Sequence, residues 1–587
     1  MSDHEAIWSP NWRDQELEIL KKGEAQWDML IVGGGITGAG IYREAARLGL
    51  KVLLVEQQDF AWGTSSRSSK MVHGGLRYLG SGQFGLANDS VKERQSLMNE
   101  LPGLVNPLPF MMGHYKGMFP GPWIFDKLLA IYDFMAGRRY RHFFSKGIRD
   151  FLVPGMNTKN LKGVTQFADA VTDDARLVLR VLHDGNKDGG VALNYLKAVD
   201  TLKNGAKVKG LAIKDQLTGE HFEVSAKVVI NATGAWTDEL RQTMGQNKVI
   251  RPLRGSHLVV PFWRLPSAFS VSFFHADDKR PVFAFPWEGV TVIGTTDLDH
   301  KQDSAKESSI TEEEVKYLLD AANHQFPDAD LSREDIRATW SGVRPVISKT
   351  AGTQELDTSK PNKPSDEKRE HAIWDDDGLI SVAGGKLTTY RLIALDVLQK
   401  AASYLSVPAA TFKKSSHFEA VDVKAINAIS KHSLSNATTS NSAISDSAIS
   451  DSAISDSAIS DFTALSSEAK KRLMGRHGLS AQALIHQAIK NGVGLNKIAS
   501  TDTLLAELVW ACQFESVHHL DDLLLRRTRI GLLLDAGALA VLDEVKQICQ
   551  EYLNWDDLKW QSERSRYLEI VQQHYSLPEK QSLQSEG

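Results

Sequence analysis

The feature that most restricts how this chain can fold is a glycine-rich turn between an apolar strand and a helix. The segment from Met29 reads "MLIVGGGITGAGIYREAARLGLKVLLVE", and Gly33, Gly35 and Gly38 give it the spacing G-x-G-x-x-G. An apolar strand runs into the glycines, a helix follows, and a second strand begins at Val52. Because these elements follow in this order, the segment predicts a βαβ unit of a Rossmann-like α/β domain.

The glycine turn indicates a dinucleotide-binding site. The first glycine allows the tight turn, the second lets the backbone approach a pyrophosphate, and the third lets the helix lie close to the strand. The helix N-terminus also offers unpaired N–H groups to the phosphates. Glu56 closes the second strand, where it can accept hydrogen bonds from ribose hydroxyls; the alternative is an ordinary acid at a strand end. The predicted dinucleotide contacts here are Gly33, Gly35, Ile36, Thr37, Gly38 and Glu56.

Two further segments favour FAD over NAD. The stretch "VVINATGAW" is an apolar strand that ends in small residues, which suits passage beneath a long cofactor. The stretch "GGKLTTYR" places two glycines at the start of a helix, whose N-terminus can stabilise the negative charge on a reduced flavin. The alternative for each segment is a close-packed turn. The cofactor contacts predicted from them are Ala232, Thr233, Gly234, Gly384, Gly385, Lys386, Leu387 and Thr388.

Composition narrows the class of protein. The 587 residues are enough for several domains, and a net charge of −5 gives no overall basicity that would favour nucleic acid as a partner. Two cysteines, Cys512 and Cys549, indicate a reducing compartment and no disulfide scaffold. We recognise no signal peptide and no membrane-spanning run, which predicts a cytoplasmic protein that can still lie on a membrane surface. No metal site is predicted.

The rest of the chain shows hairpins, a low-complexity repeat and a helical end. Hairpins are predicted at 215–219 and at 288–289, and the polar stretch 357–370 is predicted to be an exposed loop. Four tandem copies of "SAISD" occupy 442–461 and predict a disordered insertion, because small polar repeats cannot build a core. From residue 465 onward the pattern is helical and indicates a separate domain.

Further motifs complete a recognisable set. They read "GTSSRSSKMVHGGLRYL", "VVINATGAW", "RPLRGSHLVV", "TWSGVRP" and "GGKLTTYR". With the glycine turn they span roughly Asp28 to Leu392 in order, and together they resemble the FAD-dependent glycerol-3-phosphate dehydrogenases. The segment "LDDLLLRRTRIG" is similar to the helical cap domain of that family, whereas the "SAISD" array departs from its pattern.

The resemblance implies a fold of the glycine-oxidase and D-amino-acid-oxidase type. A discontinuous FAD-binding domain is expected over 27–80, 165–250 and 345–407, with an antiparallel-sheet substrate domain over 81–164 and 251–344. An N-terminal extension over 1–26, a linker over 408–464 and an all-helical C-terminal domain over 465–587 complete the expected organisation.

The resemblance also implies an activity and its partners. The expected reaction is the oxidation of sn-glycerol 3-phosphate to dihydroxyacetone phosphate, with the C2 hydride passing to FAD and the electrons to ubiquinone or menaquinone. The expected location is the inner face of the cell membrane, with peripheral attachment, and a homodimer is the expected assembly.

Specific roles follow from what this reaction requires. Cations must hold the phosphate, a base must take the hydroxyl proton, and a flavin must accept the hydride. On the resemblance, the segment after the βαβ unit wraps the cofactor, and Arg77 and Tyr78 emerge beside the substrate; the alternative is a glycine-rich turn with solvated side chains. The cofactor contacts expected from this segment are Thr64, Ser65, Ser66, Ser69, Lys70, His73, Gly74, Gly75 and Leu76.

Three residues from other segments complete the expected catalytic and substrate-binding set. His257 is the first choice for the base because an unperturbed His titrates near neutral pH, the alternative being a His satisfied within the core. Arg344 is expected to stabilise the alkoxide at C2 or to share the phosphate. Lys386 is expected to contact the phosphate or the pyrimidine edge of the flavin. The sequence does not determine which of Arg77, Arg344 and Lys386 binds the phosphate.

The region 110–146 is a candidate membrane surface. It combines apolar residues with a basic cluster that could stay above anionic headgroups; the alternative is a buried helix ending in a solvated basic turn. The apolar residues are Met111, Met112, Met118, Phe119, Trp123 and Phe125, and the cations are Arg138, Arg139, Arg141 and Lys146.

Three other functions compete with the dehydrogenase. A glycerol-3-phosphate oxidase of the same family would pass electrons to O₂ and release H₂O₂. An amino-acid oxidase on the same fold is disfavoured because several phosphate-suited cations occur among the motifs. A flavin-binding protein without turnover is disfavoured because the expected Arg and His positions are present.

Overall fold

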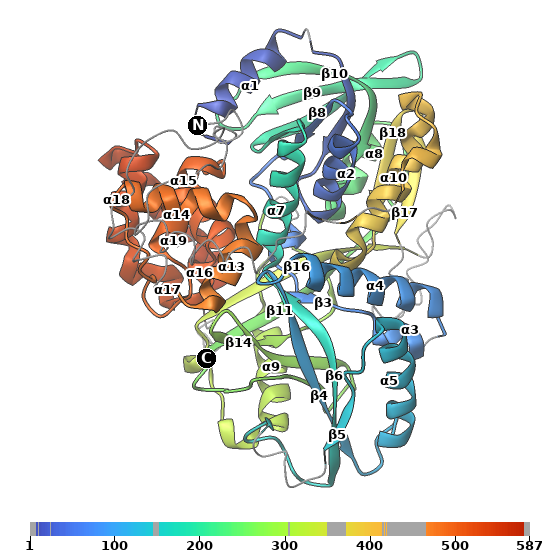
Figure 1. Ribbon diagram of the computed structural model, residues 1–587, viewed down its shortest axis with the longest axis vertical. Helices are drawn as coiled ribbons and strands as arrows, with labels where there is room; N and C mark the ends of the chain where they lie inside the picture. Colours follow the sequence, from blue (N-terminus) through green and yellow to red (C-terminus); the bar gives the residue numbers. More distant parts are fainter. Residues whose placement is uncertain are drawn as a thin grey trace, which may run out of the picture.

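The computed structural model describes residues 8–579 apart from 10, 24, 81, 145–151, 303–305, 349–370, 414–415, 417 and 419–464. Two β-sheets lie one above the other in the view of Figure 1, and the C-terminal helices pack along their side. The predicted loop over 357–370 and the "SAISD" repeat over 442–461 lie outside the described residues.

The first sheet contains the predicted βαβ unit. Strands β1 and β2 are parallel, with Leu30 opposite Leu53, and β10 lies on the other side of β1. These strands are almost continuously apolar because both faces of the sheet are covered. The strand order is β17-β18-β10-β1-β2-β7, with β9 paired antiparallel to the first residues of β10 and β8 paired antiparallel to β9. The bounds are β1 Trp27–Val32, β2 Val52–Val55, β7 Val191–Leu193, β8 Leu196–Asn204, β9 Lys207–Asp215, β10 His221–Asn231, β17 Ala372–Asp376 and β18 Leu379–Ala383.

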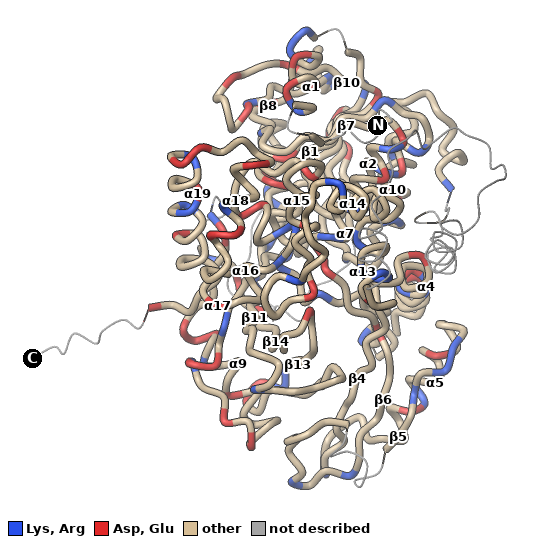
Figure 2. Tube along the Cα trace, turned by 60° about the vertical axis from the view of Figure 1, so that its left-hand side comes forward, with Lys and Arg blue, Asp and Glu red and all other residues tan. Residues whose placement is uncertain are grey.

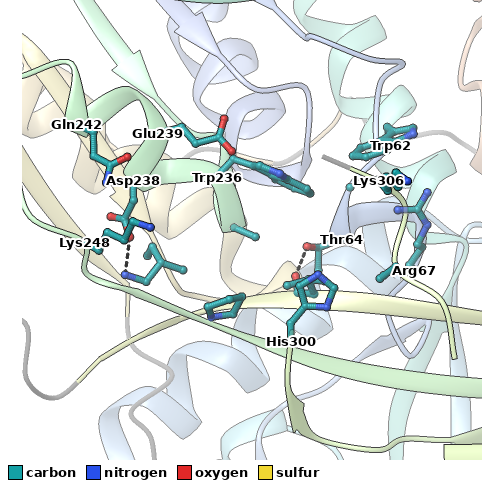
Figure 3. A pocket seen from close by; sticks show the side chains of 16 residues that line it. Trp62, Thr64, Arg67, Trp236, Asp238, Glu239, Gln242, Lys248, His300 and Lys306 are labelled. Carbon is teal, nitrogen blue, oxygen red and sulfur yellow. Dashed lines mark hydrogen bonds between the residues drawn. The ribbon is translucent and has the colours of Figure 1, made fainter. Parts of the chain in front are cut away.

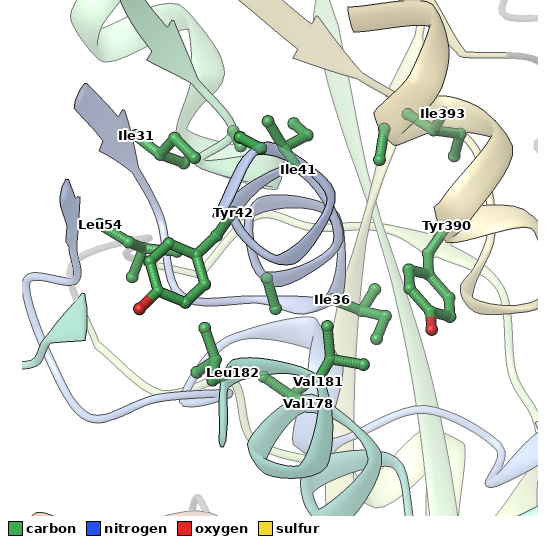
Figure 4. Packing of buried hydrophobic residues seen from close by; sticks show 14 of the residues in the cluster. Ile31, Ile36, Ile41, Tyr42, Leu54, Val178, Val181, Leu182, Tyr390 and Ile393 are labelled. Carbon is green, nitrogen blue, oxygen red and sulfur yellow. The ribbon is translucent and has the colours of Figure 1, made fainter. Parts of the chain in front are cut away.

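Helices α2 Ile36–Arg47, α7 Asp174–Lys187 and α10 Tyr390–Leu405 cover one face of this sheet. Figure 4 shows Ile36 of α2 lying between Val181 of α7 and Tyr390 of α10. The other face is covered by α1 Trp12–Lys21, β8, β9 and α8 Thr237–Gln242. The predicted N-terminal extension is therefore integrated into this domain, since Leu17 and Leu20 of α1 are buried in its core.

The second sheet is mostly antiparallel. The hairpin predicted at 288–289 is confirmed here by β13–β14, and the hairpin predicted at 215–219 is confirmed by β9–β10 of the first sheet. The order is β15-β11-β14-β13-β12-β4-β6-β3, with β16 paired to β11 and β5 to β6. Helix α9 Glu312–Gln325 covers one face, and its N-terminus is fixed by a capping box between Thr311 and Glu314. The bounds are β3 Met71–Val72, β4 Val105–Tyr115, β5 His142–Phe144, β6 Leu161–Thr172, β11 Ile250–Pro261, β12 Ser270–Phe274, β13 Pro281–Trp287, β14 Val290–Gly294, β15 Leu298–Asp299 and β16 Ala338–Ile347.

Two expected domain boundaries differ from the sheets. Residues 165–172 and 71–72 were assigned to the FAD-binding domain, but they form parts of β6 and β3, which pair with each other in the second sheet. The chain passes from the first domain to the second sheet at the segment 66–70, before β3, and from that sheet to α7 at 173–174.

Three of the six apolar residues that the sequence assigned to a candidate membrane surface over 110–146 are buried. Its first residues continue β4, in which Met111 and Met112 are buried, and Phe125 is buried on α5 Pro122–Ala136. The exposed apolar side chains include Phe119 and Trp123, at 78% and 72%, together with Phe134 at 86%. Helix α5 packs beside α3 Leu76–Gly80 and α4 Phe84–Glu100. Arg141 pairs with Asp126 and Asp133, and Lys146 lies outside the described residues.

The predicted helical C-terminal domain is confirmed and packs on the second sheet opposite α9. Trp340 of β16 and Phe285 of β13 share its core, and Cys512 and Cys549 are buried in it as free thiols. Its elements are α13 Ser467–His477, α14 Ser480–Lys490, α15 Leu505–Phe514, η9 Asp522–Arg527, α16 Ile530–Leu533, α17 Asp535–Ala538, η10 Leu539–Val541, α18 Leu542–Tyr552, α19 Asp557–Ile570 and η11 Val571–Tyr575.

Buried ion pairs join this helical domain to the first domain. Arg526 and Arg527 both contact Asp59, with nitrogen–oxygen distances of 2.5 and 2.6 Å. Arg176 of α7 contacts Glu515 at 2.5 Å. Because these groups are almost completely buried, each depends on its partner for compensation of its charge.

Candidate active site

The glycine turn has the close backbone approach that the spacing predicted. Gly33 has φ +112°, and a Cβ there would lie 2.6 Å from the carbonyl oxygen of Ala232. A Cβ at Gly38 would overlap the carbonyl oxygen of Gly33, so helix α2 can lie this close to β1 only with glycine at this position. Gly35 is the N-cap of α2 and has no side chain to occupy the helix N-terminus.

Glu56 lies beside this N-terminus at the end of β2. Its carboxylate accepts hydrogen bonds from the backbone N–H groups of Gly34 at 2.7 Å and Gln58 at 2.9 Å. Burial raises the pKa of Glu56 above its ordinary value, although these hydrogen bonds act in the opposite direction. The carboxylate is therefore held in a fixed position at the edge of the cavity described next.

A cavity of about 670 Å³ runs from the glycine turn to the second sheet. Its size is within the range of about 300–1,000 Å³ typical of cofactor sites. Most of the predicted cofactor residues line it, together with three predicted substrate-site residues. The predicted residues that line the cavity are Gly33, Gly35, Ile36, Thr37, Glu56, Thr64, Ser65, Ser69, His73, Ala232, Thr233, Gly234, His257, Arg344, Gly384, Gly385, Lys386, Leu387 and Thr388.

The other predicted site residues do not line this cavity. They are Gly38, Ser66, Lys70, Gly74, Gly75, Leu76, Arg77 and Tyr78. Arg77 is exposed on α3. Gly38 and Gly74 lie where the backbone packs too closely against its neighbours for a side chain to fit. Cavity residues that the sequence did not single out include Gln57, Lys197, Phe283 and Thr295. These residues belong to none of the sequence motifs, because they lie on separate strands and turns that only the fold brings together at the cavity.

Lys70 was predicted to line the cofactor, but its side chain points into the protein. Its Nζ donates to Asp174 at 2.8 Å and to the carbonyl oxygen of Ser66 at 2.5 Å. Burial, followed by the charge of Arg529, lowers the pKa of Lys70 to about 7. Buried contacts of Lys70 therefore fix the loop that carries Ser65 and Ser69 on the side that faces the protein interior.

Gly74 and Gly75 make room for two tyrosines. A Cβ at Gly74 would overlap the hydroxyl of Tyr132 on α5, and a Cβ at Gly75 would lie 2.5 Å from the ring of Tyr78. The Nζ of Lys386 lies 3.5 Å from the centre of the Tyr78 ring. Tyr78 therefore positions the Lys386 ammonium from outside the cavity wall.

His257, the predicted base, is an almost completely buried ring. Its Nε2 lies 2.9 Å from the Ser69 hydroxyl, and the ring stacks on Trp340 at 5.0 Å. Burial, followed by the charges of Arg344 and Lys70, holds the pKa of His257 well below its ordinary value. A His with this environment is a weak base at neutral pH.

His73 forms a pair with a buried carboxylate, that of Asp169, which the sequence did not reveal. Its Nδ1 lies 3.2 Å from Asp169 Oδ2, and the ring lies at the cavity with 38% of its side chain exposed. Asp169 also accepts hydrogen bonds from Tyr132 at 2.5 Å and Arg94 at 2.6 Å. Burial raises the pKa of Asp169, but His73 and Arg94 outweigh it and lower this pKa to about 2. The carboxylate fixes the ring so that Nε2 is the nitrogen available to a substrate.

Arg344 of β16 supplies a guanidinium to the cavity wall. Its side chain contacts Asp297 at 3.0 Å and Thr295 at 3.4 Å. Gly255 makes room for it, because a Cβ at that position would lie 2.5 Å from the Arg344 NH2 nitrogen. Arg344 and Lys386 therefore give the cavity two cations from different domains.

A smaller cavity of about 190 Å³ lies beside the large one, and Figure 3 shows its lining. Trp62, Thr64 and Trp236 belong to the walls of both cavities. The Thr64 hydroxyl donates to the carbonyl oxygen of Val343, which ties the segment after β2 to β16. The lining of the smaller cavity carries both signs of charge, including Glu239 and Lys248.

No group of three or more His, Cys, Asp or Glu side chains suited to a metal ion occurs among the described residues. Nor does that part of the chain contain a helix with the length and apolarity to cross a membrane.

Comparison with known proteins agrees with this geometry. The family model for FAD dependent oxidoreductases matches residues 28–391, and the model for the C-terminal domain of alpha-glycerophosphate oxidase matches residues 438–559. An aerobic glycerol-3-phosphate dehydrogenase from Staphylococcus haemolyticus is 39% identical over 397 residues, which cover 66% of this chain and 69% of the relative. This chain belongs to the family of FAD-dependent glycerol-3-phosphate dehydrogenases.

Solved structures share the fold of this chain. The glycerol-3-phosphate dehydrogenase from Bacillus halodurans, complexed with FAD, has a TM-score of 0.71 and 27% identity, covering 96% of this chain and 97% of that one. An L-alpha-glycerophosphate oxidase from Mycoplasma pneumoniae shares the fold, with a TM-score of 0.51, 18% identity and coverage of 68% and 99%. The expected fold of the FAD-dependent oxidoreductases is confirmed.

The cofactor of this family fits the residues present. The FAD-dependent family requires a pyrophosphate site, a ribose acceptor and a donor-rich segment, and the cavity offers the α2 N-terminus, Glu56 and the segment 384–388. Thr388 lies in η7 Leu387–Thr389, which begins directly after Lys386. We conclude that FAD is the cofactor of this chain, as the sequence predicted.

Proposed function

We propose that this chain oxidises sn-glycerol 3-phosphate to dihydroxyacetone phosphate. The supporting observation is that Arg344, Lys386 and His73 converge on one cavity that continues to the dinucleotide site. A phosphorylated secondary alcohol needs cations and a base in this combination. The two cations bind the phosphate, and because Arg77 lies outside the cavity wall it is not assigned to the substrate.

His73 is the base in this proposal in place of His257. Asp169 contacts its Nδ1, so Nε2 accepts the proton of the C2 hydroxyl and the buried carboxylate stabilises the imidazolium that forms. His257 contributes instead as a hydrogen-bonded wall that fixes Ser69. Bound FAD supplies the acceptor for the C2 hydride. The Arg344 guanidinium and the Lys386 ammonium hold the phosphate and so orient the substrate within the cavity.

Anaerobic mixing of the yellow holoenzyme with sn-glycerol 3-phosphate tests this assignment. Loss of the flavin absorbance is expected, with no loss for glycerol or sn-glycerol 1-phosphate at the same concentration. An unchanged spectrum with sn-glycerol 3-phosphate would refute the substrate. Recovery of the colour after addition of a soluble quinone or of air then separates the two acceptors.

Membrane quinone is the proposed acceptor, and the exposed face of α5 is the proposed membrane contact. Trp123 and Phe134 of α5 are exposed, as is Phe119 just before the helix. The cations Lys127 and Arg138 lie on α5 and on the turn after it. Figure 2 shows Lys and Arg on this segment at the edge of the molecule. Apolar side chains can enter the headgroup region while each nearby cation contributes about 1 kcal/mol with anionic lipid.

Vesicle binding tests this surface. Sedimentation with anionic vesicles is expected to weaken in salt, in Arg138→Glu/Arg139→Glu and in Trp123→Ser/Phe134→Ser. Trp263→Ser is the matched control, because Trp263 is 74% exposed on the turn between β11 and β12. Equal effects of the α5 and Trp263 changes would refute the assignment. This attachment would place the enzyme at the inner face of the cell membrane.

The remaining partner expected from the family resemblance is a second copy of the chain. We keep a homodimer as a proposal, and light scattering of the detergent-solubilised holoenzyme measures it directly. Fast reoxidation by air with release of H₂O₂ would replace the quinone-linked dehydrogenase by the oxidase without changing the proposed chemistry at C2.

A further inference from the structure

Arg280 lies behind the cavity wall and contacts the same carboxylate as Arg344. Its NH2 donates to Asp297 Oδ2 at 2.9 Å, and its NH1 donates to the Asp297 carbonyl oxygen at 2.7 Å. Arg344 uses the other carboxylate oxygen of Asp297, at 3.0 Å. Neither Arg280 nor Asp297 lines the cavity, whereas Arg344 does. The three side chains form a row with one carboxylate between two guanidinium groups.

The turn that carries Arg280 is held firmly. It connects β12 to β13, and the N–H of His275 donates to the Arg280 carbonyl oxygen at 2.8 Å. The His275 ring stacks on Tyr317 of α9 at 3.8 Å, with the two planes 4° apart. Tyr317 also donates to Asp278 at 3.0 Å. Since both ends of the turn are fixed, Arg280 has a defined position relative to Asp297.

The charges in this row decide how strongly Arg344 attracts an anion. A single Asp beside a single Arg would cancel most of the field that reaches the cavity. With Arg280 on the outer oxygen, the row of three carries a net charge of +1 while Asp297 still orients the Arg344 guanidinium. We infer that Arg280 is a positioning residue that keeps Arg344 electrostatically available to the phosphate of the substrate.

This inference rests on the proposed function, but it predicts an effect on anion binding that can be measured separately. Removal of the Arg280 charge leaves Asp297 to neutralise Arg344. In Arg280→Met, KM for sn-glycerol 3-phosphate and the inhibition constant of inorganic phosphate are both expected to rise about tenfold, the factor that corresponds to about 1.4 kcal/mol. The kcat value is expected to change much less, because ground-state binding is affected.

Two further variants separate charge from structure. In Arg280→Met/Asp297→Asn the net charge of the row is again +1, so both constants are expected to return to within about threefold of the wild type. Lys279→Met removes a neighbouring exposed cation of the same turn, whose Nζ contacts Ala276 instead, and should leave both constants unchanged. Flavin content and Tm of every variant verify the fold.

The decisive result is the pattern across these proteins. A tenfold rise in Arg280→Met that the double variant reverses supports the inference. A KM in Arg280→Met equal to the wild type, a rise that the double variant does not reverse, or the same rise in Lys279→Met would overturn it. If the wild type does not oxidise sn-glycerol 3-phosphate, the proposed function fails, and titration calorimetry with inorganic phosphate still compares the wild type with Arg280→Met.

Discussion

Asp169→Asn is the change that tests the proposed base most sharply. The carboxylate lies 3.2 Å from His73 Nδ1 and would stabilise the imidazolium formed when the C2 hydroxyl loses its proton. At an effective dielectric constant of about 20, two unit charges at this distance attract by about 5 kcal/mol. Screening at a ring that is 38% exposed reduces the expected contribution to about 2–3 kcal/mol. The rate of flavin reduction should therefore fall about 30- to 150-fold.

A double-mutant cycle distinguishes this role from a loss of structure. Anaerobic stopped-flow absorbance gives the rate of flavin reduction for Asp169→Asn, His73→Asn and the double variant. If Asp169 acts through His73, the double variant should be no slower than His73→Asn, because the carboxylate has lost the group it assists. Multiplied effects of the two changes, or an unchanged rate in Asp169→Asn, would contradict the reasoning. His257→Asn serves as the comparison and should cost less than His73→Asn.

Three further predictions concern the cofactor site and stability. Gly38→Ala should lower the FAD content of the purified protein, measured by the ratio of flavin to protein absorbance, because its Cβ overlaps the Gly33 carbonyl oxygen; full FAD content would contradict it. Asp59→Asn should destabilise the fold by about 3–5 kcal/mol in denaturant titrations, since Arg526 and Arg527 lose their buried partner; an unchanged unfolding midpoint would show that the pair is not needed. The lowered pKa of Asp169, about 2 in the fold, implies stability of about 2 kcal/mol that is complete above pH 4 and is lost as the pH falls through 2. Asp169→Asn should show a smaller loss over that window in acid unfolding, and an equal loss would refute the assignment.

The parts of the fold that the sequence predicts are those encoded locally. The glycine turn, both hairpins and the helical C-terminal domain depend on neighbouring residues and were predicted correctly. Lys70 was misplaced because its partner Asp174 is 104 positions away, so no local pattern reveals that its ammonium points inward. A similarly large separation concealed the pair of His73 with Asp169, which lies 96 positions further along the chain.

The exposure of part of the candidate membrane segment was mispredicted for a related reason. Met111 and Met112 are apolar in the sequence whether β4 buries them or not, and only the pairing with β6 and β12 decides their exposure. Helix α5 buries Phe125 and exposes Trp123, since successive residues of a helix point to different faces. The fold also decides which of the predicted phosphate-binding cations reaches the cavity. The short helix α3 exposes Arg77 to solvent, whereas β16 brings Arg344 to the cavity.

In the proposed reaction, the C2 hydrogen of sn-glycerol 3-phosphate leaves within this cavity as a hydride. The most direct measurement compares anaerobic flavin reduction by sn-glycerol 3-phosphate with and without deuterium at C2, under saturating substrate. Deuterium at C2 is expected to slow the loss of flavin absorbance, whereas deuterium at C1 is expected to leave the rate unchanged. Equal rates for the C2-labelled and unlabelled substrates, or no reduction by either, would contradict the proposed reaction.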